Sequence, residues 1–121
     1  MGKPALEFHA IENMRWKRVT KSIKKGKAWE KILSRDKDNN IFTRLYKLDP
    51  GCETKGILSH DFWEEIYILE GGLVDLRKRK IYTAGMYACR PPGMKHGPYA
   101  APVGCLLFEV RYKCPTKTAK S

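Results

Sequence analysis

Short apolar segments separated by glycine and proline fill the sequence between residues 41 and 112. Residues 41–48 are rich in β-branched, aromatic and alternating side chains, and they end at the turn signal Asp49-Pro50-Gly51. Later segments of the same kind cover residues 65–69, 73–76, 81–83, 86–89 and 105–112. Strands this short and this regularly spaced predict an all-β fold, a closed or nearly closed antiparallel β-barrel.

The length of 121 residues fits one domain, because a chain of this size supports a single compact core. We expect the barrel over residues 29–113. Residues 1–28 are expected to form an N-terminal arm or strands that pack on the barrel or on a partner subunit. The polar tail, residues 114–121, has no apolar partner in sequence and is expected to be disordered.

The sequence contains no apolar stretch near the ~20 residues that a membrane-spanning helix needs. Its first ten residues lack the charged start and apolar run of a secretory signal. We therefore expect a cytoplasmic protein with no membrane partner. The four cysteines, Cys52, Cys89, Cys105 and Cys114, form no C-x-x-C pair and are expected to be reduced thiols rather than a disulfide framework or zinc ribbon.

The formal net charge of +11 is concentrated in basic blocks, chiefly residues 15–31 and 77–80. A basic surface attracts anions of many kinds and keeps a protein soluble. Recognition of nucleic acid would require aromatic stacking platforms among the basic residues or a groove-reading helix. Gly26 interrupts any helix across the first block, so solvated surface is favoured over nucleic-acid binding.

Two of the three histidines lie in spaced motifs, and the third, His9, lies in the N-terminal arm. The first motif contains His60, Glu64 and Gly71, and the second contains Gly85, Pro91, Gly93 and His96. Two imidazoles and a carboxylate placed among short strands outline a site for a first-row transition metal.

These motifs resemble the two signature motifs of the cupin superfamily over about residues 29–112. The second cupin motif, a Gly, five residues, Pro-x-Gly, two residues and a His, is matched at every position. The short link between the motifs is most similar to the anti-sigma-factor (ChrR-like) cupin domains and the small cupin dioxygenases. The resemblance implies a jelly-roll barrel with a metal site. It also implies a homodimer, with Trp16, Trp29 and Ile32 as candidate interface residues.

The chain departs from the family at the first motif. Where cupins have the first His of His-x-His, this chain has Leu58, and an aliphatic side chain cannot coordinate a cation. The remaining set, His60, Glu64 and His96, has the composition of several catalytic zinc sites and of the facial triad for non-haem iron. A divalent iron, manganese, nickel or zinc ion is expected there. The alternative is a decayed site, with the histidines hydrogen-bonded in the mouth of a metal-free barrel.

Glu65 is an alternative metal ligand, because its spacing from His60 and Gly72 does not exclude it. Adjacent residues of a strand point to opposite faces, so only one of the two glutamates can face the interior. Glu64 is preferred because it shares parity with Ile66 and Ile68, which would line the same inner wall.

Aromatic and thioether side chains near the motifs are candidates for a substrate pocket, since small-molecule sites are largely apolar with a few polar groups. The alternative for each is ordinary packing in the core or at the rim. The candidates are Trp63, Tyr67, Tyr87, Met94 and Tyr99.

Three functions are consistent with these features. The first is a metal-dependent dioxygenase or related enzyme acting on a small anionic, carbonyl or phenolic substrate. The second is a metal-binding or ligand-sensing module without turnover, as the resemblance to anti-sigma-factor cupins would suggest. The third is a metal-free, isomerase-like or binding cupin in which His60 or His96 acts as a general base.

Overall fold

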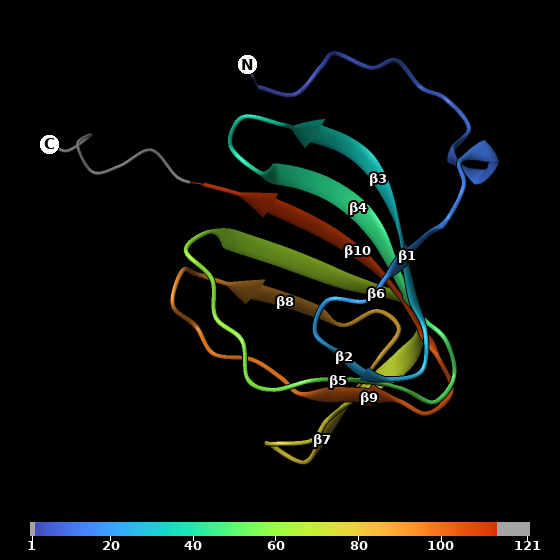
Figure 1. The fold of residues 1–121 in the computed structure, drawn as a ribbon, viewed down its shortest axis with the longest axis vertical. Helices are drawn as coiled ribbons and strands as arrows, with labels where there is room; N and C mark the ends of the chain where they lie inside the picture. Colours follow the sequence, from blue (N-terminus) through green and yellow to red (C-terminus); the bar gives the residue numbers. More distant parts are fainter. Residues whose placement is uncertain (1, 114–121) are drawn as a thin grey trace, which may run out of the picture.

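The computed structural model describes residues 2–113, and strands dominate this part of the chain (Figure 1). One short 3-10 turn, η1, covers Ile11–Asn13. The strands are β1 (Lys17–Val19), β2 (Ile23–Lys25), β3 (Ala28–Asp36), β4 (Ile41–Leu48), β5 (Cys52–Thr54), β6 (Trp63–Asp75), β7 (Lys80–Thr83), β8 (Tyr87–Arg90), β9 (Tyr99–Ala101) and β10 (Cys105–Tyr112). Within residues 2–113 no helix has the length needed to traverse a lipid bilayer.

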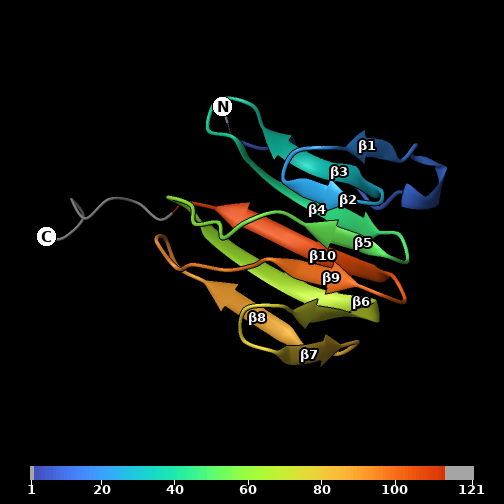
Figure 2. The same ribbon diagram turned by 60° about the horizontal axis from the view of Figure 1, so that its bottom comes forward.

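The strands form two curved antiparallel sheets that face each other and share β6. The first sheet has the order β1-β3-β4-β10-β6-β8, and the second has the order β7-β6-β9-β5-β2. Figure 1 shows the broad first sheet above the shorter strands of the second, which Figure 2 brings forward. The nearly closed antiparallel barrel confirms the all-β, jelly-roll prediction.

Strand β6 differs from the sequence-based expectation. Two strands, 65–69 and 73–76, were expected on either side of Gly71 and Gly72, but one continuous strand runs through both glycines. Gly71 has φ +77°, and a Cβ there would collide with the carbonyl group of Gly104. Gly71 therefore allows two backbone segments to approach closely where β6 passes from one sheet to the other. It does not form a turn that reverses the chain.

The barrel interior divides into an apolar end and a charged end. In β10, Cys105 and Leu107 are buried with the apolar core, whereas Glu109, two residues further on, is a buried charge. In β4, Leu48 and Tyr46 belong to the core, and the next residue of the same parity is Arg44. In the strand registers, the positions where inward-facing residues change from apolar to charged lie next to each other on neighbouring strands. The charged residues therefore gather at one end of the barrel.

The N-terminal arm lies against the outer side of the first sheet. Lys31 in β3 is only 7% exposed and donates a hydrogen bond to the Ile11 carbonyl oxygen at 3.1 Å. The ammonium groups of Lys31 and Lys47 lie 4.8 and 4.4 Å from the centroid of the Trp16 ring. Lys3 adds a hydrogen bond to Thr43 at 2.8 Å. The homodimer and the division at residue 28 stay predictions, and the expected tail, 114–121, lies outside the described residues.

Candidate metal centre

The structure brings the three predicted ligand residues together at the charged end of the barrel. One ligand atom from each of His60, Glu64 and His96 lies within 4.8 Å of the others. His60 precedes β6, Glu64 is the second residue of β6, and His96 lies shortly before β9. Residues from two separate motifs therefore meet because the β6 entry and the loop after β8 lie at the same end of the barrel.

Backbone hydrogen bonds fix this meeting point. The amide of Leu58 donates to the His96 carbonyl at 2.8 Å, and the His96 amide donates to the Leu58 carbonyl at 2.9 Å. The Gly93 amide donates to the His60 carbonyl at 2.8 Å. Leu58 thus pairs directly with His96 and supplies no side-chain donor atom, so the candidate site has three residues that could act as ligands.

The alternation of β6 separates the two glutamates. Glu64 is 5% exposed and faces the interior with Ile66 and Ile68. Glu65 lies on the outer face, where Tyr112 donates to its Oε2 at 2.6 Å and Tyr87 donates to its Oε1. These two hydrogen bonds lower the pKa of Glu65 and hold its carboxylate outside the barrel. Glu65 therefore takes no part in the His60, Glu64 and His96 cluster.

Burial keeps both histidines neutral at physiological pH. It lowers the pKa of His60, with Glu64 opposing the shift. It lowers the pKa of His96 to about 4, and Arg90 and His60 add to this effect. A neutral imidazole retains the lone pair that binds a metal ion.

The donor set fits a divalent transition metal. Two neutral imidazoles and one carboxylate form the composition of catalytic zinc and non-haem iron sites. The His60 ring stacks on Phe62 with centroids 4.6 Å apart and lies 5.1 Å from the His96 ring. Nδ1 of the buried His96 makes no well-formed hydrogen bond within the described residues. Iron, manganese, nickel and zinc all accept such a set, and three ligands leave coordination positions open.

Lowered histidine pKa values predict that the metal-free protein loses stability in acid. Between pH 6.5 and about 4, the unfolded chain binds a proton at His96 and the folded chain does not. Stability therefore falls as pH decreases through this window, and His60 acts in the same direction. Urea unfolding at pH 7, 6, 5 and 4.5 should show a shallower decline for His96→Gln than for wild type. An equal decline of stability in both proteins would contradict the lowered pKa of His96.

Arg90 is a neighbour of the site that sequence analysis did not assign. Its Nη1 donates to Glu64 Oε1 at 2.9 Å, and its Nη2 donates to the Tyr99 hydroxyl at 2.7 Å. Arg90 pairs with Glu64 in the β6–β8 register. The charge-assisted hydrogen bond holds one carboxylate oxygen and leaves the second oxygen of Glu64 for a ligand.

A second group of charged residues lies in the same interior. Arg44 Nη1 donates to Glu30 Oε1 at 2.6 Å, and its Nε donates to Glu109 Oε1 at 2.8 Å. The guanidinium of Arg111 lies 4.1 Å from the centroid of Phe42 and 4.0 Å from that of Phe62. These residues were missed because a charged strand residue normally faces solvent. Their parity with the apolar residues of the same strands was the available signal.

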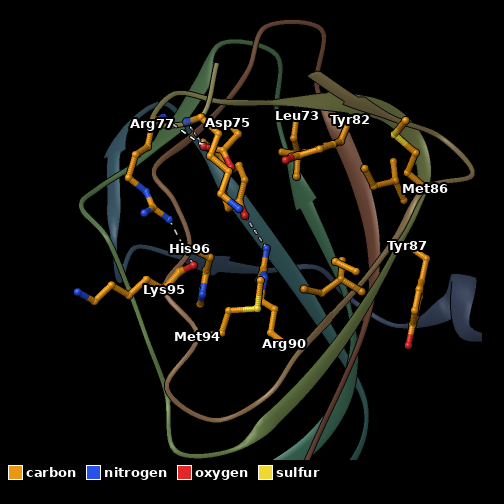
Figure 3. A pocket seen from close by; sticks show the side chains of 15 residues that line it. Leu73, Asp75, Arg77, Tyr82, Met86, Tyr87, Arg90, Met94, Lys95 and His96 are labelled. Carbon is orange, nitrogen blue, oxygen red and sulfur yellow. Dashed lines mark hydrogen bonds between the residues drawn. The ribbon is translucent and has the colours of Figure 1, made fainter. Parts of the chain in front are cut away.

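The ligand cluster and the charged groups line one cavity of about 390 Å³. Of the predicted pocket residues, Tyr99 lines this cavity. Tyr87, Met94 and Tyr99 line a neighbouring cavity of about 230 Å³ (Figure 3). Trp63 lies outside both cavities and stacks on Tyr112 with centroids 6.3 Å apart. Tyr67 also lines neither cavity, because both residues share the outward parity of Glu65.

The two cavities share a wall that carries the site. Arg90, His96 and Tyr99 line both, together with Ile66 and Leu73. Figure 3 shows Arg90 and His96 pointing into the space between the sheets. Side chains of this wall are therefore accessible from the charged lumen and from the more apolar second cavity.

The fold and the position of the site define a cupin. The chain belongs to the ChrR cupin-like domain family, whose sequence profile matches residues 6–114. No curated protein matches the chain in sequence.

Several solved structures share the fold at low sequence identity. The acetylacetone dioxygenase of Acinetobacter johnsonii is 16% identical with a TM-score of 0.73, and the match covers 93% of this chain and 76% of that one. An RmlC-like cupin from Shewanella frigidimarina is 18% identical with a TM-score of 0.68, covering 95% and 97%. The polyketide cyclase RemF of Streptomyces resistomycificus is 18% identical with a TM-score of 0.66, covering 93% and 83%.

Proposed function

We propose that this cupin is a metal-dependent enzyme of the dioxygenase type that acts on a small anionic substrate. The observation that carries the proposal is the convergence of His60, Glu64 and His96, with ligand atoms within 4.8 Å, on a cavity of about 390 Å³. A cavity of this size accommodates a small molecule rather than a polymer. The missing fourth ligand at Leu58 leaves room for substrate and oxygen.

The surroundings of the His60, Glu64 and His96 cluster favour the binding of a cation. His60 and His96 are neutral and present lone pairs, while Arg90 holds Glu64 in position through a 2.9 Å ion pair. A bound divalent metal would polarise a substrate carbonyl and, if redox-active, activate dioxygen. The buried aliphatic floor formed by Ile66 and Leu107 limits access of water from the opposite end of the barrel.

The structural neighbours support the proposal only at the level of fold. One neighbour with this fold is an acetylacetone dioxygenase, and another, RemF, is a polyketide cyclase. One scaffold hosts many reactions, so the side chains of this site decide the chemistry. The basic rim residues Lys21 and Arg35, which line the cavity, favour an anionic substrate.

A sensing or binding role without turnover is the second candidate, and the match to the ChrR cupin-like family favours it. In that role the same three ligands would hold a metal or small molecule without consuming oxygen. Metal retention is therefore common to both candidates, and only turnover separates them.

Elemental analysis of untagged protein is the first test, and it should give about one transition metal ion per chain. His9→Ala is the matched control, because His9 is exposed in the N-terminal arm and should leave the metal content unchanged. Iron-loaded protein should then consume oxygen with small 2-oxo acids or phenolic acids. Metal binding without oxygen uptake would favour the sensing role. Failure to bind any of the four metals would overturn the proposal.

A further inference from the structure

Arg111 differs from the other arginines inside the barrel because no carboxylate neutralises it directly. Arg44 pairs with Glu30 and Glu109, and Arg90 pairs with Glu64. Within residues 2–113, Arg111 makes neither an ion pair nor a side-chain hydrogen bond, and its Nε is buried without a partner. Arg111 as a whole is half-buried and lines the cavity. A guanidinium that is partly removed from water without hydrogen-bond partners is costly, and such groups commonly await a ligand.

Two aromatic rings hold this guanidinium in place. The centroids of Phe42 and Phe62 lie 4.1 and 4.0 Å from its central carbon. Such contacts stabilise the cation while leaving the N–H groups at its edge available for hydrogen bonds. Phe62 also stacks on His60 at 4.6 Å. One phenyl ring therefore contacts both Arg111 and a member of the ligand cluster.

The charges of the cavity point to the same kind of ligand. Three carboxylates and three guanidiniums inside it balance each other: Glu30, Glu64 and Glu109 against Arg44, Arg90 and Arg111. Because a histidine binds a metal ion as the neutral imidazole, a divalent cation would leave an excess of two positive charges. Lys21 and Arg35 at the rim add to this excess. An anion is the ligand that would restore the balance.

We infer that Arg111 is the substrate-binding residue of this cavity and that it takes the carboxylate of a small 2-oxo or 2-hydroxy acid. The adjacent carbonyl or hydroxyl oxygen would then face the ligand cluster beyond Phe62. This assignment rests on the proposed function, since it uses the metal to receive the second oxygen. A planar guanidinium binds a carboxylate through two parallel hydrogen bonds, which lysine cannot reproduce.

The test compares pyruvate with pyruvamide, its neutral analogue of the same shape, by calorimetric titration of manganese-loaded protein. Wild type should bind pyruvate more tightly than pyruvamide. Arg111→Met should lower the affinity for pyruvate by about 10- to 100-fold, because the charged hydrogen bonds are lost. Its affinity for pyruvamide should stay nearly unchanged. Arg111→Lys keeps the charge but not the two-pronged geometry, and it should recover only part of the preference.

Arg18→Met is the matched control. Arg18 also lies over an aromatic ring, that of Trp29 at 5.5 Å, but it is exposed and lines neither cavity. The Arg18→Met protein should bind pyruvate and pyruvamide with the affinities of wild type. Equal binding of pyruvate by wild type and Arg111→Met, or no preference for pyruvate in wild type, would overturn the inference. If Arg111→Met fails to fold, the pyruvate preference of Arg111→Lys decides the question.

Metal content measured in the same samples separates this inference from the proposed function. If wild type and Arg111→Met hold equal metal and both bind pyruvate alike, only the role of Arg111 is wrong. If wild type holds no metal, the proposed function fails. The comparison of pyruvate with pyruvamide is then made on the metal-free protein, where loss of a wild-type preference in Arg111→Met would still assign the carboxylate to Arg111.

Discussion

Replacing His96 with alanine should abolish metal retention while the barrel stays folded. His96 is one of three candidate ligand residues whose donor atoms lie within 4.8 Å of each other, and Leu58 opposite it offers no substitute donor. Loss of an outer hydrogen-bond partner alone costs metal sites about 10–100-fold in affinity. Loss of a ligand from a site with only three should exceed that range. His60→Ala should behave in the same way.

The fold should survive because His96 contributes its backbone, and not its ring, to the local structure. The two hydrogen bonds with Leu58 join main-chain atoms, and alanine retains both. Removing a neutral buried imidazole also removes the group that takes up a proton on acid unfolding. Metal titration with a competing chelator, alongside circular dichroism, checks both statements. Retention of stoichiometric metal by a folded His96→Ala protein would show that the ion binds elsewhere.

Glu64→Gln distinguishes ligation from a purely electrostatic role at the same site. The amide keeps the size of the side chain and an oxygen acceptor, but it loses the charge that pairs with Arg90 at 2.9 Å. If the carboxylate binds the metal, affinity should fall in this variant as it does in His96→Ala. If only the Glu64–Arg90 ion pair matters, stability should fall and metal affinity should hold.

The sequence predicted the fold well where local pattern and tertiary environment agree. The strands over 41–48 and 105–112 occur with those limits, because alternation and flanking turns mark both. The preference for Glu64 over Glu65 as the inward residue was also a parity argument, and Glu64 is buried beside Ile66. Each of these features depends on near neighbours in the chain.

The features that sequence analysis missed depend on partners far along the chain. The glycine pair in β6 has the composition of a turn, but the carbonyl oxygens of Gly104 and Tyr82 approach Gly71 and Gly72 so closely that a Cβ would not fit at either position. Arg44 and Glu109 are 65 residues apart, and each alone resembles a solvent-facing charge. Their burial is explained by the β4–β10 register, which places the two opposite charges directly across from each other. A charged barrel lumen is therefore a property of register, which the one-dimensional pattern does not contain.

Truncating Arg44 should produce the largest loss of stability among the charged residues of the lumen. The side chains of Arg44 and Glu109 are 14% and 8% exposed, and that of Glu30 is 22% exposed. Burial alone would lower the pKa of Arg44, but the two carboxylates raise it above its ordinary value. Arg44→Met leaves both carboxylates without their cation. Removing one partner of a buried pair costs about 3–5 kcal/mol.

A double-mutant cycle separates the pairing from the packing of the residue. Glu109→Gln alone should also destabilise the protein, whereas Arg44→Met combined with Glu109→Gln should cost less than the sum of the two single changes. The difference should be about 2 kcal/mol, within the range for residues in one ion-pair network. Urea unfolding of the four proteins measures it. Additive effects would show that Arg44 acts mainly by packing on Tyr46, whose ring centroid lies 4.2 Å from its guanidinium.

Arg35→Met provides the control for loss of charge near the same cavity. Arg35 lines the lumen but is exposed, and it lies 5.7 Å from the centroid of the same Phe42 ring that contacts Arg44. Its loss should change stability by no more than about 0.5 kcal/mol, as for other surface substitutions. A large effect of Arg44→Met beside a small effect of Arg35→Met would show that the buried ion pairs stabilise the charged end of the barrel. That end carries His60, Glu64 and Arg111, so its rigidity sets how precisely a metal and a carboxylate can be held together.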